Sequence, residues 1–194
     1  MTERLRLFVA CELSQEVKEA LARLQAELRP RHLERLRWVR LEGIHLTLKF
    51  LGETPADKVP AIERALAEAA TGVGPFALSL GELGTFPDPR RGRPRVIWVG
   101  LSGELQPLAE LQKRLETSLA GLGFAPEERP FSPHLTLARV PPEQVASLAP
   151  RIQEAIAAVR VSKVAQRVTE VSLMRSILQA GGAVYQKVAA WPLG

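Results

Sequence analysis

The spacing of apolar residues along the chain predicts strands and helices in alternation. Residues 7–11 form a short apolar run that is typical of a buried strand. Ser14 then stands where a helix is often capped, and apolar residues recur every three or four positions over residues 15–28. The same spacing predicts a helix over residues 104–119, which would end at Gly121.

Two further helices and four further strands are expected. One helix would open at Thr54-Pro55, with Thr54 as its cap and Pro55 in its first turn, and another would open at Pro142. Strands are predicted over residues 76–83, 96–101, 168–173 and 183–188. The last two strands would pair through a short connection that contains Gly181-Gly182.

The chain also repeats itself. The tetrapeptide His-Leu-Thr-Leu occurs at residues 45–48 and again 89 positions later, at residues 134–137. Ser14 and Ser102 precede two of the predicted helices at nearly the same separation. Repeats of this kind indicate two halves of similar structure. We therefore predict an α+β fold, with a single bilobal domain over residues 1–194 built from two pseudo-symmetric halves.

The motif strands are predicted over residues 44–51 and 134–139. In the first, apolar and polar side chains alternate, which turns one set to the core and the other to the opposite face of the strand. The core set would be Ile44, Leu46, Leu48 and Phe50, and the polar set would be His45, Thr47 and Lys49. His134 and Thr136 stand in the same relation in the second strand. With one motif in each lobe, both His-Thr pairs can face a single ligand across a cleft.

Two imidazoles without another strong catalytic group suit acid–base chemistry at phosphorus. A neutral histidine can take a proton from the nucleophile while a protonated one gives a proton to the leaving group. Threonine hydroxyls can donate to the non-bridging oxygens, and Lys49 or Arg139 could add positive charge. Metal catalysis is the rival explanation. The chain has no cysteine pair, no His-Glu-x-x-His and no acidic cluster beside either motif, so no metal is expected.

Composition indicates which partners the protein binds and in which cellular compartment it is expected. The 26 basic residues exceed the 21 acidic ones, and arginines cluster in residues 29–40 and 90–95, which favours a polyanionic partner. Cys11 is the only cysteine, so no intrachain disulfide can form and a cytoplasmic protein is expected. No run of 18 apolar residues is present, so no membrane association is expected.

Longer strings around these motifs resemble the bacterial and archaeal RNA 2',3'-cyclic phosphodiesterases, also called 2'-5' RNA ligases, a family of the two-histidine phosphoesterases. The strings are RLFVA at residues 6–10, HLTLKFLG at 45–52, FPDPR at 86–90, SPHLTLAR at 132–139, and SLM at 172–174 with GAVY at 182–185. They extend over essentially the whole chain in the family's order, so the resemblance is specific.

The resemblance implies two antiparallel sheets with outer helices around a central basic cleft. It also implies metal-independent opening of RNA 2',3'-cyclic phosphate ends to 2'-phosphomonoesters, with reversible 2'-5' ligation as the reverse-type activity and without a cofactor. By motif position, His45 would be the proton donor and His134 the proton acceptor. The residues that would bind the phosphate are Thr47, Thr136 and Arg139.

Arg139 needs an irregular strand to take part. Strict alternation would place its side chain on the face opposite His134. It reaches the phosphate only if the strand ends or bulges near Ala138.

Two alternatives stay open. The chain could be a non-catalytic RNA-binding module, although a pure binder would have no need of titratable imidazoles. It could also act on small cyclic nucleotides or on a cyclic phosphate of ADP-ribose. The basic clusters favour a longer polyanion, and the Pro- and Arg-rich residues 86–95 are a candidate contact for the RNA backbone. The expected form of the protein is a monomer that acts on RNA ends.

Overall fold

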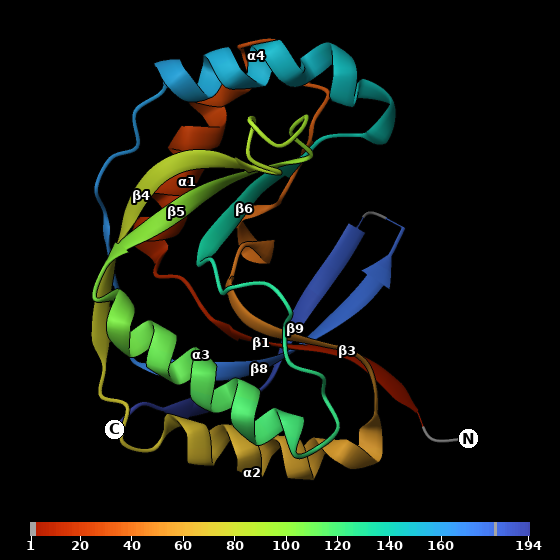
Figure 1. The fold of residues 1–194 in the computed structure, drawn as a ribbon, viewed down its shortest axis with the longest axis vertical. Helices are drawn as coiled ribbons and strands as arrows, with labels where there is room; N and C mark the ends of the chain where they lie inside the picture. Colours follow the sequence, from red (N-terminus) through yellow and green to blue (C-terminus); the bar gives the residue numbers. More distant parts are fainter. Residues whose placement is uncertain (1–2, 181) are drawn as a thin grey trace.

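The chain folds into two antiparallel sheets, which the computed structural model describes over residues 3–180 and 182–194 (Figure 1). The first sheet contains β1 (Arg4–Cys11), β3 (Leu46–Pro55), β8 (Glu170–Gln179) and β9 (Gly182–Pro192), in the order β3-β1-β8-β9. The second sheet contains β2 (Arg37–Trp38), β4 (Phe76–Phe86), β5 (Val96–Gly103), β6 (His134–Arg139) and β7 (Ala165–Val168), in the order β2-β6-β5-β4-β7. The predicted α+β fold with two antiparallel sheets is confirmed.

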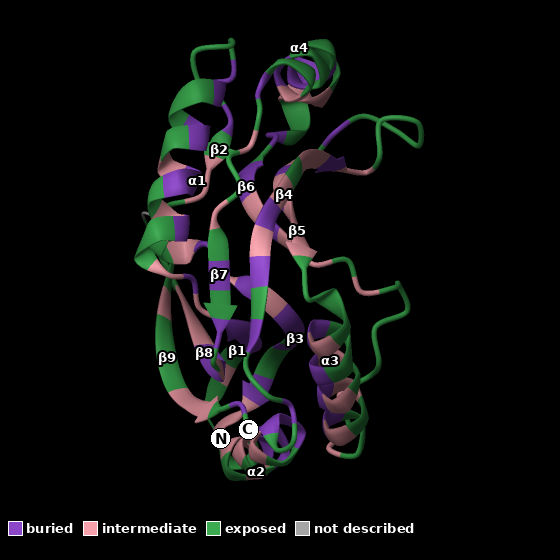
Figure 2. Cartoon of the chain, turned by 90° about the vertical axis from the view of Figure 1, so that its left-hand side faces the viewer, coloured by how far each residue is buried: buried purple, intermediate pink, exposed green. Residues whose placement is uncertain are grey.

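Helices lie against the outer side of each sheet. The second sheet packs with α1 (Gln15–Leu28) and α4 (Val145–Ala158), and the first with α2 (Val59–Ala70) and α3 (Leu105–Ala120) (Figure 1). Each helix turns a stripe of buried residues inward (Figure 2), as the apolar spacing predicts. The Ser14 hydroxyl accepts a hydrogen bond from Val17 N at 3.3 Å, which confirms the predicted cap of α1.

Each lobe contains elements from both halves of the chain. β4, the last strand of the first half, pairs with β5 in the second sheet, and β8 from the second half pairs with β1 in the first sheet. The helix after β1 also crosses over, because the backbone N–H of Ser14 donates to the Gln166 side chain of β7 at 2.7 Å. One cluster of buried apolar residues runs through both sheets and α1, α2, α3 and α4. The two lobes are therefore held together by exchanged elements and a shared core.

The predicted start of the second helix is wrong. Thr54 does not cap a helix, because β3 continues to Pro55 and the buried Thr54 hydroxyl donates to the Gly52 carbonyl at 3.2 Å. A short 3-10 turn, Ala56–Lys58, follows the strand, and α2 begins only at Val59. The Thr54 hydroxyl therefore donates to a backbone carbonyl at the end of the strand and does not accept from a backbone N–H at the start of a helix.

The predicted strand over residues 168–173 is two strands. Val168 ends β7 in the second sheet, and Glu170 begins β8 in the first sheet. β8 and β9 form the predicted hairpin, while Gly181 of its turn lies outside the described residues. The chain thus changes sheets within a single residue, which the apolar periodicity cannot show.

Each motif strand carries a β-bulge at the same place in its motif. In β3 the pairing with β1 skips Leu48, and in β6 the pairing with β5 skips Leu137. An extra residue inverts the alternation beyond it, so the side chain five positions after each motif histidine turns to the face of that histidine. These two side chains are Phe50 and Arg139.

The bulges correct the predicted faces of both strands. Phe50, expected in the core, is 66% exposed. Lys49, expected on the polar face, is buried. Arg139 meets the condition stated for it, because the bulge at Leu137 brings its side chain to the face of His134.

Gln25 of α1 holds the second bulge in place. Its side-chain amide is buried and donates to the Val39 carbonyl at 2.8 Å and to the Leu137 carbonyl at 3.1 Å. The Leu137 carbonyl also accepts from Val39 N at 2.9 Å. A helix from the first half of the chain thus satisfies backbone groups at the irregular place in β6.

Replacing Gln25 with Leu removes both donated hydrogen bonds, so the Val39 carbonyl loses its side-chain donor and the Leu137 carbonyl keeps only Val39 N. We expect a loss of about 1–3 kcal/mol in the free energy of unfolding, the usual cost of an unsatisfied buried group. Urea denaturation followed by circular dichroism measures this loss. Gln15→Leu, on the exposed side of the same helix, is the control and should change stability by less than about 0.5 kcal/mol. Equal losses in the two variants would contradict a specific role for the Gln25 amide.

Candidate active site

One cleft between the two sheets collects the residues that the sequence singles out. It has a volume of about 1020 Å³ and receives residues from β1, β3, β6, β8 and β9. The residues predicted for the site all line it: His45, Thr47, His134, Thr136 and Arg139. His45 immediately precedes β3 and Thr47 is the second residue of that strand, in one sheet, whereas the other three lie on β6, in the other sheet. The duplication therefore places one His-Thr pair on each wall of the cleft.

His45 lies against aromatic rings of the first sheet. The Phe8 ring meets the imidazole edge-on at 5.8 Å between centroids, and the Tyr185 ring does so at 5.3 Å. Burial lowers the pKa of His45 below the usual histidine value, and the Lys18 ammonium adds a smaller lowering, while the backbone of Gly43 and the carboxylate of Glu12 raise it. The rings thus restrict the orientation of the imidazole, and Glu12 favours its protonated form.

His134 is held by a hydrogen bond and by two other rings. The Phe86 ring lies edge-on at 4.8 Å and the Trp98 ring lies at 6.2 Å. The Nδ1 atom of His134 is 2.7 Å from the carbonyl oxygen of Ser132. Because a carbonyl oxygen can only accept, Nδ1 carries the hydrogen. In the neutral ring, Nε2 is therefore the atom that can accept a proton.

The charge beside His134 favours this neutral form. Burial lowers the pKa of His134, and the nearby Arg139 guanidinium lowers it further, against the raising effect of the Ser132 hydrogen bond. The two imidazoles therefore differ in their surroundings, because a carboxylate and a more weakly acting ammonium lie near His45, whereas a guanidinium acts on His134.

Hydroxyl and guanidinium donors lie beside the imidazoles. Thr47 and Thr136 follow their histidines by two positions, and both are half-buried in the wall of the cleft. Arg139 is exposed at the end of β6, and none of the ion pairs among residues 3–180 and 182–194 includes it. These groups can donate hydrogen bonds to an anion held between the two imidazoles.

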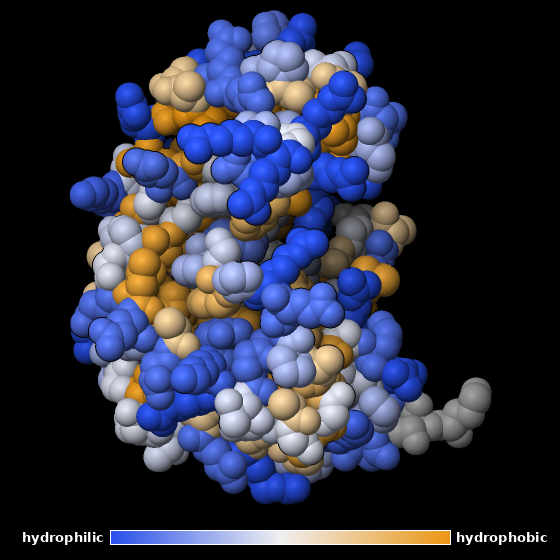
Figure 3. Space-filling view, viewed as in Figure 1, coloured by the Kyte–Doolittle hydropathy of each residue, from blue (hydrophilic) through white to orange (hydrophobic). Residues whose placement is uncertain are grey.

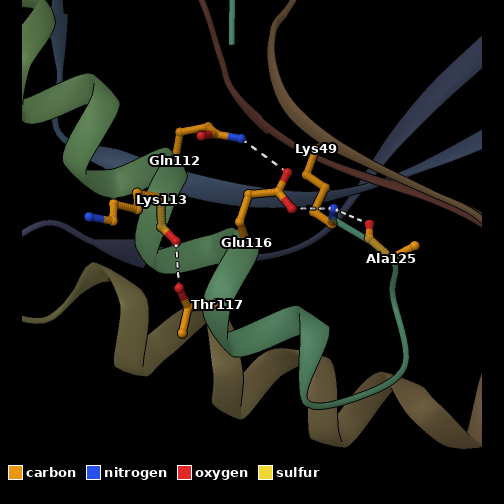
Figure 4. A network of polar contacts seen from close by, with 6 residues as sticks. All are labelled: Lys49, Gln112, Lys113, Glu116, Thr117 and Ala125. Atoms are coloured by element: carbon orange, nitrogen blue, oxygen red, sulfur yellow. Dashed lines mark hydrogen bonds and ion pairs between the residues drawn. The ribbon is translucent and has the colours of Figure 1, made fainter. Parts of the chain in front are cut away.

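Lys49 is not the free cation that strand alternation predicts. Its ammonium lies 2.7 Å from the Glu116 carboxylate and donates to the Ala125 carbonyl at 2.9 Å (Figure 4). Gln112 donates to the other Glu116 oxygen at 3.1 Å, and the Lys49 side chain is 1% exposed. The bulge at Leu48 explains the difference, because it turns Lys49 away from the face of His45 and towards α3.

The cleft carries a positive charge. Arg6, Arg129 and Arg139 line it, and within the described residues the carboxylate of Glu127 is the acidic group in its lining. In that same part of the chain, no group of three or more His, Cys, Asp or Glu side chains could hold a metal ion. A separate finding concerns the helices: in the part of the chain that the structure describes, none is long and apolar enough to cross a membrane.

Sequence reasoning misses the rings that hold the imidazoles. Phe8 and Tyr185 come from strands near opposite ends of the chain, and Phe86 comes from the end of β4. The nearest signal is the alternation within residues 6–10, which puts Arg6 and Phe8 on one face of β1. That alternation does not reveal which histidine the face meets.

Comparison with known proteins agrees with this arrangement. The family described as LigT like Phosphoesterase matches the chain twice, over residues 12–98 and over residues 99–185. The chain belongs to the LigT-like phosphoesterase family. The double match corresponds to the duplication seen in the repeated motif, and the resemblance drawn from the sequence strings is confirmed.

Curated relatives of this LigT-like phosphoesterase match nearly the whole chain at about one-third identity. The RNA 2',3'-cyclic phosphodiesterase of Methanothermobacter thermautotrophicus is 34% identical over 191 residues, which cover 98% of this chain and 100% of that protein. The Escherichia coli protein of the same name is 33% identical over 193 residues, which cover 100% of this chain and 99% of that protein. A Geobacillus stearothermophilus relative, also of that name, is 34% identical, and the chain spans 58% of its length.

Solved structures show the same fold. The structure of TT0787 of Thermus thermophilus has a TM-score of 0.76 at 30% identity and covers 97% of each chain. Escherichia coli LigT complexed with 3'-AMP has a TM-score of 0.76 at 30% identity, covering 98% of this chain and 99% of that one. The chain is therefore a phosphoesterase with the bilobal fold of this family.

The lowered pKa values of the two site histidines predict a pH-dependent loss of stability. Below about pH 6.5, unfolded histidines take up protons that His45 and His134 in the folded chain do not yet accept. Their contribution to the free energy of unfolding is therefore present above pH 6.5 and lost as the pH falls below it. The double variant His45→Gln/His134→Gln should show a shallower fall than the wild type, measured by urea denaturation at fixed ionic strength.

His32→Asn is the matched control for this experiment. His32 is exposed and has a φ of 63°, a conformation that Asn tolerates. This variant should keep the wild-type slope of stability against pH. A wild-type slope in the double variant would show that burial of the two site imidazoles does not contribute.

Proposed function

We propose that the protein opens 2',3'-cyclic phosphate ends of RNA to 2'-phosphomonoesters by paired-histidine acid–base catalysis. The observation that carries the proposal is the position of two His-Thr pairs on opposite walls of one arginine-lined cleft. The relatives named RNA 2',3'-cyclic phosphodiesterase support the choice of substrate. The proposed reaction is metal-independent, because two imidazoles can supply both of its proton transfers.

In this reaction, Nε2 of neutral His134 takes a proton from water while the water oxygen attacks phosphorus. The P–O3' bond breaks, and the imidazolium of His45 gives its proton to the departing O3'. The products are a 2'-phosphomonoester and a free 3'-hydroxyl, and proton exchange with solvent restores both rings. The donors to the non-bridging oxygens, where negative charge grows in the transition state, are Thr47, Thr136 and Arg139.

The surroundings of the two imidazoles support this division of roles. The Ser132 carbonyl fixes the tautomer of His134 that leaves Nε2 free to accept, and the Arg139 charge favours the neutral ring. Glu12 raises the pKa of His45, against burial and the smaller effect of Lys18, and so favours the imidazolium that an acid needs. A general base on one wall and a general acid on the other match the two sides of an in-line displacement.

The same site would accept the 5'-hydroxyl of a second RNA end in place of water. That substitution joins the two ends through a 2'-5' linkage, and its reversal regenerates the cyclic phosphate. Arg90, Arg91 and Arg93 of the β4–β5 loop are exposed and stay candidates for contact with the RNA backbone. The alternatives are a small cyclic nucleotide as the substrate and a purely RNA-binding role. Assays of turnover on both kinds of substrate distinguish these alternatives from the proposed reaction.

We further propose that the protein acts as a monomer in the cytoplasm. Cys11 is buried in the first sheet, and burial raises the pKa of its thiol to about 12. A thiol in that state is not ionised near neutral pH and does not exchange with disulfides. Cys11 therefore has no redox role in this proposal.

Incubation with an oligoribonucleotide ending in a 2',3'-cyclic phosphate tests the reaction directly. In excess EDTA we expect wild-type protein to produce a 2'-phosphate end as fast as it does without EDTA. Chromatography of the products measures the rate. His45→Ala and His134→Ala should each lower turnover by about 10² to 10⁴, the usual contribution of a general acid or base. Loss of activity on chelation would contradict the metal-independent mechanism, and full activity of either variant would remove that histidine from it.

A substrate with sulfur in place of O3' separates the acid from the base. A thiolate leaves without a proton, because a thiol ionises near pH 8.5 whereas an alcohol does not. With this cyclic phosphorothiolate, the deficit of His45→Ala should shrink to less than about tenfold, while that of His134→Ala should persist. The opposite pattern in the two rates would reverse the assignment.

A further inference from the structure

The cleft is larger than one reacting phosphate needs. The wall formed by the first sheet, which contains β1, β3, β8 and β9, carries apolar side chains. Its volume of about 1020 Å³ reaches the upper end of the range of about 300–1,000 Å³ for sites that bury one drug-sized ligand. Phe50 of β3 and Leu178 of β8 line this wall and are 66% and 70% exposed. Figure 3 shows hydrophobic side chains at the middle right, where Figure 1 draws the β8–β9 hairpin. Exposed apolar side chains that line a cleft mark a binding surface.

The rings on this wall form a path away from His45. Phe8 contacts the imidazole at 5.8 Å and Phe50 at 6.2 Å between ring centroids. Phe8 is 4% exposed, because Phe50, His45 and Tyr185 surround it. Phe50 is the outer ring of this path and keeps most of its surface open to the cleft. A ring with this exposure contributes little to the stability of the core. We therefore interpret its position in the cleft as a contact for a ligand.

The duplication makes the position of Phe50 informative. Phe50 and Arg139 each stand five residues after a motif histidine, and a bulge turns each of them into the cleft. In one lobe this position carries a guanidinium, which suits the reacting phosphate. In the other lobe the equivalent position carries an aromatic ring, which suits the flat face of a base. The two lobes thus offer different chemistry at matching places.

A free cation lies beside the ring. Arg6 precedes Phe8 by two positions on β1, faces the cleft and is exposed. Within the described ranges, no ion pair includes Arg6, whereas Arg175, which stands opposite Leu7 on β8, pairs with Glu3 at 3.1 Å. An exposed aromatic ring next to an unpaired guanidinium is the combination that binds single-stranded nucleic acid, by stacking and by a backbone contact.

We infer that Phe50 and Arg6 form a subsite for the nucleotide that precedes the cyclic phosphate end. The base of that nucleotide stacks on Phe50, and the phosphodiester that links it to the terminal nucleotide contacts Arg6. This inference rests on the proposed function, because the cyclic phosphate between the imidazoles sets the register. The subsite accepts any base, since each base offers a π face. It makes an oligonucleotide a better substrate than a cyclic mononucleotide.

The test compares two substrates with the same terminal base, a 2',3'-cyclic mononucleotide and a trinucleotide ending in the same cyclic phosphate. Phe50→Ala should lower kcat/KM for the trinucleotide by about 5- to 150-fold, the range that loss of one stacked base produces. The same variant should change kcat/KM for the mononucleotide by less than about twofold. Phe50→Trp should restore the trinucleotide rate, because stacking requires only an aromatic face.

Arg6→Gln tests the phosphate contact through salt. For the trinucleotide, the slope of log(kcat/KM) against log salt concentration should become shallower by about 0.7, the release expected for one phosphate contact to a single strand. The mononucleotide has no such linking phosphate, so its slope should be unchanged. An unchanged slope with the trinucleotide would remove Arg6 from the subsite.

Val184→Ala is the control from the same sheet, on the face of β9 opposite Ala183 and Tyr185. Val184 is 41% exposed on β9 but does not line the cleft, so both substrates should keep their wild-type rates. Equal losses of Phe50→Ala on both substrates would show that the ring only supports His45, and no loss on either would show that no base stacks there. Either result overturns the subsite.

Binding separates failure of the subsite from failure of the proposed reaction. Fluorescence anisotropy of a 5'-labelled trinucleotide ending in a 3'-phosphate reports the subsite without turnover. If wild-type protein leaves both cyclic substrates intact, the proposed function fails. A weaker trinucleotide complex with Phe50→Ala would then still support the subsite, and equal affinity would overturn it.

Discussion

One extra residue in each motif strand decides which side chains reach the cleft. Without the bulges at Leu48 and Leu137, regular alternation would turn Phe50 and Arg139 towards the core and Lys49 towards the ligand. The irregular backbone needs support, because buried carbonyls must find donors. Gln25 of α1 supplies donors at the second bulge, and the buried Lys49–Glu116 ion pair ties the first motif strand to α3. The set of side chains that line the cleft thus depends on contacts with both α1 and α3.

Burial of the imidazoles is the second constraint. Rings pack against both histidines, restrict their orientation and remove water from one side of each. Desolvation lowers the pKa of His45 and of His134, so each ring is held closer to its neutral state in the free protein. A bound phosphate reverses this effect for the ring that must act as an acid, because its negative charge stabilises the imidazolium. Ligand binding therefore supplies part of the protonation state that the chemistry requires.

Sequence periodicity predicted the features that depend on local pattern. The α+β class, the duplication and the family follow from repeated motifs and helical spacing, and α1 matches its predicted bounds over residues 15–28. It failed where tertiary contacts decide. A bulge has no local signature, so strand alternation assigns Phe50 and Lys49 to the wrong faces. The exchange of strands between lobes is equally invisible, because pairing of β8 with β1 joins opposite ends of the chain.

Duplication alone would build a symmetric cleft, yet displacement at phosphorus needs an acid on one side and a base on the other. The symmetry is broken by side chains around the repeated motifs rather than within them. Arg139 lies near His134, whereas the equivalent position near His45 carries Phe50. Each ring has a hydrogen bond to the backbone two residues earlier, at Gly43 or Ser132, so the difference lies in the charges: Glu12 and, more weakly, Lys18 act on His45, whereas Arg139 acts on His134. Identical His-Thr pairs can therefore take opposite roles, because different neighbours surround each of them.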